Sequence, residues 1–402
     1  MNNTPRANRP HIGIFGRRNA GKSSLLNALT NQEVALVSEE AGTTTDPVYK
    51  NMELLPLGPI VLIDTAGIDD TGILGNLRMQ KTSQVLDKTD LAILVIDATE
   101  DISDYELDII GEFIKRQIPY ISVLNKIDHP QRKSKTYFGN YLNISLNEVS
   151  TKTMEGIDQL KRLIIENISD SFAANTIVGD LLEAGDTCVL VTPIDSGAPR
   201  GRLILPQVQT LRDILDNNAM ALVTKETNLK TSIGALAKPP KLVITDSQAF
   251  AEVDKILPSD IPLTSFSILF ARNKGDLATI VTGINAIKTL QAYDKVLIAE
   301  ICTHHKVAED IASVKIPNIL RKLESKIDIS WCSGTAYPDN IEDYKLIIHC
   351  GACMINRKQM LSRIKKATEK GVPITNYGVF LAYATGILDR AIKPFNLQFD
   401  EI

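Results

Sequence analysis

The sequence predicts an α/β protein built from three successive α/β domains, the first with a mostly parallel sheet. Short apolar runs alternate with longer amphipathic stretches, a pattern typical of parallel strands covered by helices on both faces. This alternation restarts twice, after the polar stretch SDSFAANT and near LPSDIPL. A chain of 402 residues also exceeds one domain of ~100–200 residues. We therefore expect domains at 8–172, 178–262 and 263–402.

The first domain is expected to contain strands at HIGIF, IVLID, LAILVID and YISVLN, with a helix that opens at Lys22. In the second domain, CVLVT, MALVT and KLVIT read as strands, while TLRDILDN and QAFAEVDKIL read as helices. The third domain is expected to place strands at TSFSILF, VLIAEIC, IDISW and KLIIHC. Its helices are expected from Leu277 to Tyr293, through Ile319, and from near Asn356 and Val379.

Composition and charge place the chain among ordinary globular proteins. Apolar residues make up 44% of it, charged residues make up 23%, and the net charge is −4. This balance carries no basic footprint for neutralising phosphates, so we expect no nucleic-acid partner. The first ten residues are polar and no run reaches the ~18–20 apolar residues that span a bilayer, so we expect a cytoplasmic protein without a membrane partner. Five cysteines, an odd number in a reducing compartment, predict no disulfide framework.

A glycine-rich loop, GRRNAGKS, stands directly after the predicted strand HIGIF and before the helix SSLLNAL. In that place its backbone N–H groups can cradle phosphates, helped by the positive end of the helix. Lys22 would pair with the β- and γ-phosphates, and Ser23 would ligate magnesium. The plain alternative is a chance glycine-rich turn, which becomes less favoured with each further motif in the expected order. The residues of this phosphate loop (P-loop) predicted to bind nucleotide are Gly16, Asn19, Ala20, Gly21, Lys22, Ser23 and Ser24.

Three later motifs complete a guanine-nucleotide site. Asp64 and Gly67 follow IVLID, where the carboxylate can hold magnesium through water and the glycine amide can reach the γ-phosphate. The motif NKID ends YISVLN, and its aspartate can accept both donors of the guanine N1 and N2 edge, a pair that adenine lacks. A later Ser-Thr pair matches a short loop whose backbone contacts the guanine oxygen. The expected ligands are GTP and GDP, and the base-binding residues are predicted to be Asn125, Lys126, Asp128, Ser150 and Thr151.

These motifs together resemble the translation-factor-related GTPases, in particular the branch that contains the tRNA-modifying GTPase MnmE and the ribosome-assembly GTPase Era. In that group a GTT-x-D run carries the first switch, here GTTTD, and Thr44 falls on its magnesium-sensing threonine. The resemblance implies GTP hydrolysis with catalytic roles for Lys22, Thr44 and Gly67. Asn19 stands where potassium-activated relatives place a potassium ligand, or else it caps the turn. Ile68 stands where many switch GTPases have the glutamine that orients water, so slow intrinsic hydrolysis is expected.

Cysteines and histidines gather at the ends of two predicted strands of the third domain. Cys302 and His304 follow VLIAEI, while His349, Cys350 and Cys353 follow KLII. Open parallel sheets build ligand sites at the carboxyl ends of their strands, so we expect the three thiolates to converge there. Three cysteines with a replaceable fourth ligand suit an iron–sulfur cluster, and three cysteines with a histidine suit zinc. The spacing alone leaves both metals open.

The runs AEICTHH, DNIEDYKLIIHCGACMINRKQML and GVPITNYGVFLAYATGILDRA are similar to the C-terminal domain of the iron-only (FeFe) hydrogenase maturation GTPases, the HydF family. The resemblance extends over a GTPase domain, a dimerisation domain and a cluster-binding domain in that order. It implies a scaffold or carrier that binds a 4Fe-4S cluster at Cys302, Cys350 and Cys353. It further implies that a transient di-iron precursor is received from radical-SAM hydrogenase maturases and delivered to the FeFe-hydrogenase apo-protein.

The fourth ligand of the cluster stays open between several groups. His304 and His349 match the motif histidines, although either can instead hydrogen-bond around the site. Glu300 lies two residues before the first cysteine, so on a strand it faces the same side and is a further candidate. Water or an exchangeable ligand is the remaining alternative. Cys188 and Cys332 lie outside the motif and are expected to be small buried residues.

The middle domain shows no constellation of acids, bases or metal ligands, and the resemblance assigns self-association to it. An apolar edge strand such as MALVT could pair there across a two-fold axis. Arg200 and Arg202 indicate either an anion-binding loop or, more simply, a solvated turn. Two rival functions are a ribosome- or tRNA-directed GTPase with a zinc-binding tail, and a redox enzyme. The acidic balance disfavours the first rival, and the lack of a C-x-x-x-C-x-x-C triplet disfavours the second.

Overall fold

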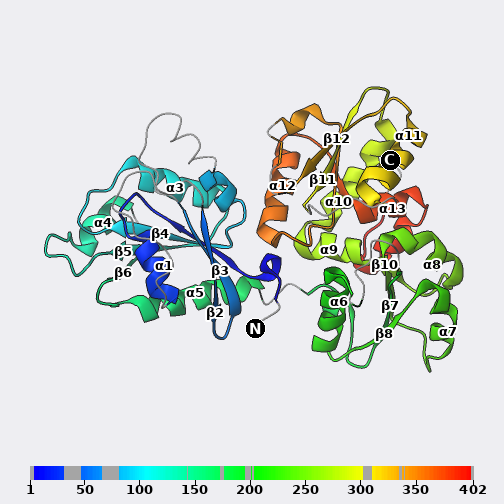
Figure 1. The fold of residues 1–402 in the computed structure, drawn as a ribbon, viewed down its shortest axis with the longest axis horizontal. Coiled ribbons are helices and arrows are strands. Elements are labelled where there is room, and N and C mark those ends of the chain that lie inside the picture. Colours follow the sequence, from blue (N-terminus) through cyan, green and yellow to red (C-terminus); the bar gives the residue numbers. More distant parts are fainter. Residues whose placement is uncertain are drawn as a thin grey trace. The chain divides into compact units, whose positions relative to one another are not determined.

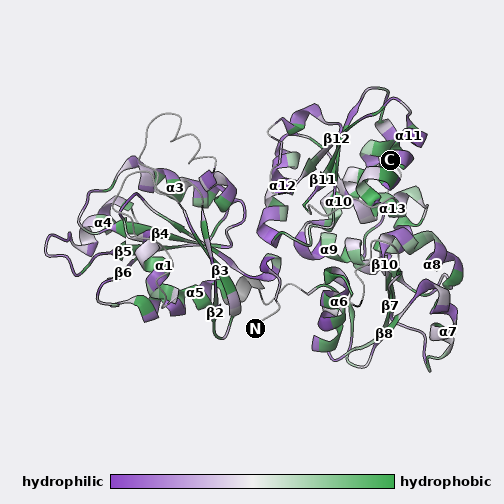
Figure 2. Ribbon diagram, viewed as in Figure 1, coloured by the Kyte–Doolittle hydropathy of each residue, from purple (hydrophilic) through white to green (hydrophobic). Residues whose placement is uncertain are grey.

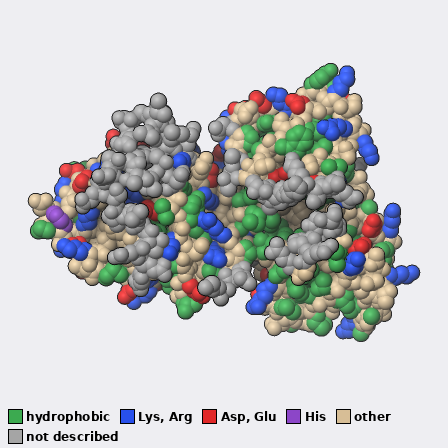
Figure 3. Space-filling view, viewed as in Figure 1, with side chains coloured by type: hydrophobic (Ala, Val, Ile, Leu, Met, Phe, Trp, Pro, Cys, Tyr) green, Lys and Arg blue, Asp and Glu red, His purple; other side chains and the backbone are tan. Residues whose placement is uncertain are grey.

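The computed structural model describes residues 4–30, 47–65, 81–142, 144–172, 176–194, 201, 203–301, 310–334, 337–338 and 340–399. The chain divides into two compact units, Met1–Asn175 and Thr176–Ile402 (Figure 1). No helix within the described ranges is both long enough and apolar enough to cross a bilayer. On the face shown in Figure 3, lysine and arginine side chains lie interspersed with acidic ones.

The first unit contains a six-stranded sheet in the order β2-β3-β1-β4-β5-β6. Its neighbouring strands are parallel except for β2, which runs antiparallel to β3. This confirms the mostly parallel sheet and the four strands predicted from apolar runs. The sequence pattern misses β2, whose residues are mostly half-exposed or exposed, and β6, which has three residues. The strands are β1 His11–Phe15, β2 Val48–Leu54, β3 Gly58–Asp64, β4 Leu91–Asp97, β5 Tyr120–Asn125 and β6 Leu146–Glu148.

Helices cover both faces of this sheet. Apolar residues of α1 and α5 pack against one face, and those of α3 and α4 pack against the other. Figure 2 shows the strands as the most hydrophobic part of the unit. Helix α3 begins after Ser103, which forms a capping box with Glu106. The described helices are α1 Lys22–Thr30, α3 Asp104–Lys115, α4 Lys135–Leu142 and α5 Ile157–Phe172, with a 3-10 turn at Arg6–Asn8.

The second unit contains two four-stranded parallel sheets, in the orders β10-β9-β7-β8 and β12-β11-β13-β14. One hydrophobic core includes residues from both sheets, so the two sheets belong to one compact unit. Cys188 is buried in a second core on β7, where burial raises its pKa to about 12, whereas Cys332 on β12 is half-buried. The strands are β7 Thr187–Val191, β8 Met220–Thr224, β9 Leu242–Thr245, β10 Leu263–Ser265, β11 Lys295–Glu300, β12 Asp328–Ser333, β13 Leu346–His349 and β14 Ile374–Asn376.

Helices follow most strands of this unit, as a parallel sheet requires. The described α-helices are α6 Leu205–Asp216, α7 Leu229–Gly234, α8 Phe250–Ile256, α9 Phe266–Lys274, α10 Leu277–Gly283, α11 Ile316–Leu323, α12 Arg357–Glu369, α13 Tyr377–Ala384 and α14 Leu388–Ile392. A π-helical turn, Ile311–Lys315, precedes α11. Short 3-10 turns lie at Gly179–Leu181, Glu226–Asn228, Ser247–Ala249, Ile284–Thr289, Ile341–Asp343 and Lys393–Phe395.

The strand predicted at TSFSILF is wrong for most of its length. Only its first residues belong to β10, and helix α9 begins at Phe266, where the Ser265 side chain accepts a hydrogen bond from the Ile268 N–H at 3.2 Å. Strand β10 pairs with β9 of the middle sheet. The domain boundary predicted between 262 and 263 therefore separates β10 from the sheet to which it belongs. The strand predicted at MALVT is β8, and it lies at an edge of that sheet.

Candidate nucleotide and cluster sites

The phosphate loop lies between the end of β1 and the start of α1, as predicted. Gly16 and Gly21 have φ angles of 151° and 94°, and Asn19 has a φ of 60°. A Cβ atom on Gly16 would lie 2.4 Å from the Val95 carbonyl oxygen, and one on Gly21 would lie 2.2 Å from the Asn125 amide nitrogen. Both positions therefore require glycine, and their open backbone suits the close approach of a phosphate group.

Lys22 and the predicted magnesium ligands lie together beside this loop. The Lys22 amine donates to the carbonyls of Gly16 and Arg17 at 2.8 and 2.7 Å, and Ser23 Oγ donates to Asp64 Oδ2 at 2.6 Å. Burial raises the pKa of Asp64, against the Ser23 hydrogen bond and the Lys22 charge. Asp64 Oδ1 is buried and has no hydrogen-bond partner among the described residues. The hydroxyl and this unsatisfied carboxylate form a donor set of the kind that magnesium prefers.

The predicted base-binding residues converge at the C-terminal end of β5. Asn125 is fully buried, and its amide donates to the Ala20 carbonyl at 3.0 Å while its Oδ1 accepts from the Thr151 N–H at 3.4 Å. Ser150 Oγ donates to Asp128 Oδ1 at 2.6 Å, and this hydrogen bond lowers the pKa of Asp128. The Asp128 side chain is thereby favoured as an ionised acceptor, which recognition of the guanine N1 and N2 edge needs.

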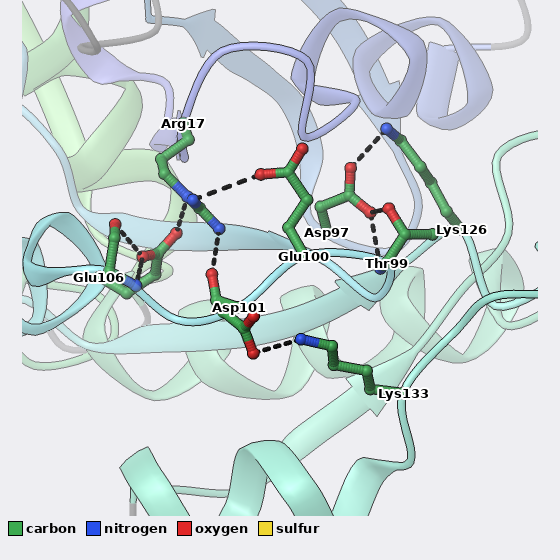
Figure 4. A network of polar contacts seen from close by, with 9 residues as sticks. Arg17, Asp97, Thr99, Glu100, Asp101, Glu106, Lys126 and Lys133 are labelled. Atoms are coloured by element: carbon green, nitrogen blue, oxygen red, sulfur yellow. Dashed lines mark hydrogen bonds and ion pairs between the residues drawn. The ribbon is translucent and has the colours of Figure 1, made fainter.

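A polar network that the sequence analysis misses connects the phosphate loop to the loop before α3 (Figure 4). Arg17 Nε donates to Glu106 Oε1 at 2.7 Å, and the Glu106 side chain is only 1% exposed. The second Glu106 oxygen accepts from the N–H and the hydroxyl of Ser103 at 2.9 and 2.7 Å. Lys126 Nζ donates to Asp97 Oδ2 at 2.5 Å. Asp97 ends β4 as Asp64 ends β3, so an acidic residue after an apolar run is the signal that could have revealed it.

Two further predicted residues lie near the phosphate loop, and others lie outside the residues that the structure describes. Ser24 is half-buried in the first turn of α1, and Asn19 is exposed on the loop, where its potassium role stays a prediction. The predicted residues outside the described ranges are Thr44, Gly67, Ile68, Arg200, Arg202, Cys302 and His304.

The second sheet of the C-terminal unit aligns the predicted cluster residues at one edge. In its parallel register, Ala299 of β11 lies opposite His349 of β13, which lies opposite Asn376 of β14. The next positions along these three strands therefore lie side by side at the carboxyl edge. These positions are Glu300, Cys350 and Tyr377.

Cys350 and Cys353 lie in the turn between β13 and α12. The Cys350 N–H donates to the Ala299 carbonyl at 2.8 Å, which ties the turn to β11. The Cys350 sulfur accepts a hydrogen bond from the Ile301 N–H at 3.4 Å. Such hydrogen bonds to sulfur tune iron–sulfur sites. Strand β11, which leads toward Cys302, is thus the direct neighbour of the strand that leads into Cys350.

Of the two roles expected for His349, the structure shows hydrogen bonding around the site, because both of its ring nitrogens are engaged. The ring is fully buried; Nδ1 lies 2.8 Å from the Cys350 carbonyl oxygen, and Nε2 lies 2.8 Å from Arg363 Nη1. A carbonyl can only accept and a guanidinium can only donate, so Nδ1 carries the proton and Nε2 uses its lone pair on Arg363. Burial and the Arg363 charge lower the pKa of His349 to about 3. His349 therefore links the turn that contains Cys350 to Arg363 of α12 through these two hydrogen bonds.

Tyr377 is a residue of this edge that the sequence analysis misses. Its hydroxyl is buried and has no hydrogen-bond partner among the described residues. Burial raises the pKa of Tyr377, and the nearby Cys350, Glu300 and Asp310 raise it further. Two thiols, an N–H directed at sulfur and an unsatisfied hydroxyl fit an anionic sulfur-rich group. The described residues alone, which exclude Cys302, do not bring three potential metal ligands together.

Two family models described as hydrogen maturase F domains match the second unit. The dimerization domain matches residues 177–275, and the tetramerization domain matches residues 278–394. Together they span more than half of the chain. A third model, described as 50S ribosome-binding GTPase, matches residues 11–126.

Individual relatives match part of the chain. The chain is 42% identical over 129 residues to GTPase Der of Mycoplasmopsis pulmonis, which covers 31% of this chain and 29% of that protein. It is 33% identical over 164 residues to the tRNA modification GTPase MnmE of Chromobacterium violaceum, which covers 40% of this chain and 36% of that protein. The chain thus spans less than half the length of these relatives. The solved structure of Era in complex with MgGDPNP and 16S ribosomal RNA nucleotides shares 28% identity at a TM-score of 0.36, over 39% of this chain and 56% of that one.

Proposed function

Because this chain belongs to the hydrogen maturase F family and carries a GTPase domain, we propose that it hydrolyses GTP to GDP and phosphate and serves as a scaffold in the maturation of iron-only hydrogenases. One observation carries the proposal. Strand β13 delivers Cys350, and its neighbour β11 leads toward Cys302, at one sheet edge of a chain whose other unit holds a guanine-nucleotide site.

In the nucleotide site, Lys22 would exchange its carbonyl partners for the β- and γ-phosphates of GTP. Ser23 and Asp64 would hold magnesium, whose charge stabilises the transferring phosphoryl group when it is bound. Asp128 would accept the guanine N1 and N2 donors, while the buried amide of Asn125 keeps the base loop against the phosphate loop. The remaining proposed contributors are Thr44 and Gly67 near the γ-phosphate and Asn19 as a potassium ligand.

In the cluster site, the three motif cysteines would hold a 4Fe-4S cluster. The proposed fourth ligand is Glu300, His304, His349 or an exchangeable ligand. The di-iron precursor is the cargo, received from radical-SAM maturases and handed to the apo-hydrogenase. The matches to dimerization and tetramerization domains support self-association, for which the edge strand β8, with Met220 54% exposed and Val223 42% exposed, is the proposed surface.

Anaerobic reconstitution with iron and sulfide tests the cluster directly. We expect about four iron and four sulfide per chain, with the visible absorption and the reduced-state electron paramagnetic resonance of a 4Fe-4S cluster. Cys350→Ser and Cys353→Ser should each lower the iron content, whereas Cys188→Ser, a buried thiol away from this edge, should not. A protein that retains zinc and forms no such chromophore would instead support a zinc-binding GTPase.

The role of the nucleotide needs a separate test, because a switch acts only if its two states differ in their contacts with other parts. Precursor transfer to the apo-hydrogenase, and release of each partner, should be compared with GTP, GDP and a non-hydrolysable analogue. Equal rates in all three conditions would remove the switch from the proposal and leave the scaffold role standing.

A further inference from the structure

The buried hydroxyl of Tyr377 is the least explained polar group at the cluster edge. Tyr377 is the first residue of α13, and the parallel register of β13 and β14 places it beside Cys350. Its side chain is packed into the core of the unit with only 8% of the residue exposed. The hydroxyl oxygen itself is buried, and no described group completes a hydrogen bond with it.

Leaving a buried hydroxyl without a partner is unfavourable, because the group gives up its hydrogen bonds to water and gains none in return. A phenylalanine would fill the same space without this cost, so the hydroxyl needs a reason at this position. Burial raises the pKa of Tyr377, and Cys350, Glu300, Asp310 and Cys332 add smaller electrostatic contributions in the same direction. Tyr377 therefore stays protonated and keeps its hydroxyl as a hydrogen-bond donor in a residue that the strand register places beside Cys350.

We propose that Tyr377 donates a hydrogen bond to a sulfur of the cluster bound beside Cys350 and thereby raises the reduction potential of that cluster. The inference rests on the proposed function, since it needs a cluster at this edge. The Ile301 N–H, directly after β11, supplies one donor to the Cys350 sulfur, and Tyr377, directly after β14 on the other side of β13, supplies a second donor. A hydrogen bond to sulfur stabilises the more negative, reduced state, so its loss makes reduction harder.

Tyr377→Phe in the full chain is the direct test, because it removes the hydroxyl and keeps the ring. Tyr383→Phe is the matched control, since Tyr383 lies on the same helix and its ring packs against Phe399 instead. After anaerobic reconstitution, the equilibrium constant for one-electron reduction of the Tyr377→Phe cluster should fall about threefold, which is ~28 mV at 59 mV per tenfold change. An exchangeable proton coupled to the reduced cluster, observed by pulsed resonance in H2O against D2O, should be lost. The Tyr383→Phe protein should match the parent in both measurements.

Replacement of Tyr377 by 4-aminophenylalanine restores a donor at the same place and should restore the parent potential. If Tyr377→Phe is folded but holds no cluster while the 4-aminophenylalanine protein holds one, the donor role is equally supported. A Tyr377→Phe cluster with the parent potential and the parent proton coupling would overturn the inference, and so would failure of both variants to hold a cluster while their GTPase activity is intact. A parent chain that binds no cluster would contradict the proposed function itself.

Discussion

Asn125 connects the two halves of the nucleotide site, so its removal should weaken nucleotide binding without changing its selectivity between di- and triphosphate. The fully buried Asn125 amide donates to the Ala20 carbonyl at 3.0 Å. Asn125→Ala leaves that carbonyl without this donor, which costs roughly 1–3 kcal/mol. In the free protein the loops can relax to recover part of the cost, and nucleotide binding must then order them again. If the loss of binding free energy is about 2 kcal/mol, the dissociation constant of the nucleotide should rise ~30-fold.

Titration with fluorescent GDP and with a fluorescent non-hydrolysable GTP analogue measures this effect. The affinities for the two nucleotides should fall by the same factor, because the Asn125–Ala20 hydrogen bond joins two protein loops and does not contact the γ-phosphate. Asn147→Ala is the matched control, since the Asn147 amide also donates to a backbone carbonyl, that of Ser122 at 3.2 Å, but within the sheet. Unchanged GDP affinity in Asn125→Ala, or a loss confined to the GTP analogue, would contradict this role of Asn125.

Three further changes test other parts of the structure. Arg17→Ala removes the guanidinium that pairs with the buried carboxylate of Glu106 on α3. The free energy of unfolding of the first unit, measured by urea denaturation with circular dichroism, should fall by about 2 kcal/mol. Trp331 is the single tryptophan and belongs to the second unit, so its fluorescence reports the unfolding of that unit. The urea midpoint measured by this fluorescence should not change in Arg17→Ala. The pKa of His349 is about 3 in the fold against ~6.5 unfolded, so its contribution to stability is complete above pH 6.5 and is lost on acidification, by about 2 kcal/mol at pH 5 in the apo-protein. His349→Gln should flatten this pH dependence of Trp331 fluorescence unfolding, and an identical slope would contradict the assignment of a neutral ring. Val223→Lys on the edge strand β8 should shift the oligomer toward monomer in light scattering, whereas Leu215→Lys, also exposed but on α6, should leave it unchanged.

Features that are local along the chain could be predicted from the order of its residues. The phosphate loop consists of contiguous residues between one strand and one helix, so its backbone and its place at the end of β1 follow from the order of glycines and apolar residues. The same holds for the strands predicted from continuous apolar runs, because a strand buried on both faces needs apolar residues at every position. The guanine motif is also local, and its residues converge at the end of β5 as expected.

Contacts between groups that are far apart in the sequence could not be predicted, and they became visible in the folded chain. TSFSILF reads as a strand because it is apolar, yet pairing with β9 and capping by Ser265 end the strand and begin a helix. The hydrogen bond between His349 and Arg363, a residue of α12, also depends on tertiary packing. Tyr377 reaches the cluster edge only through the register of β13 and β14. Such partners are selected by packing and strand register, which depend on distant residues together and leave no local signature in any one segment.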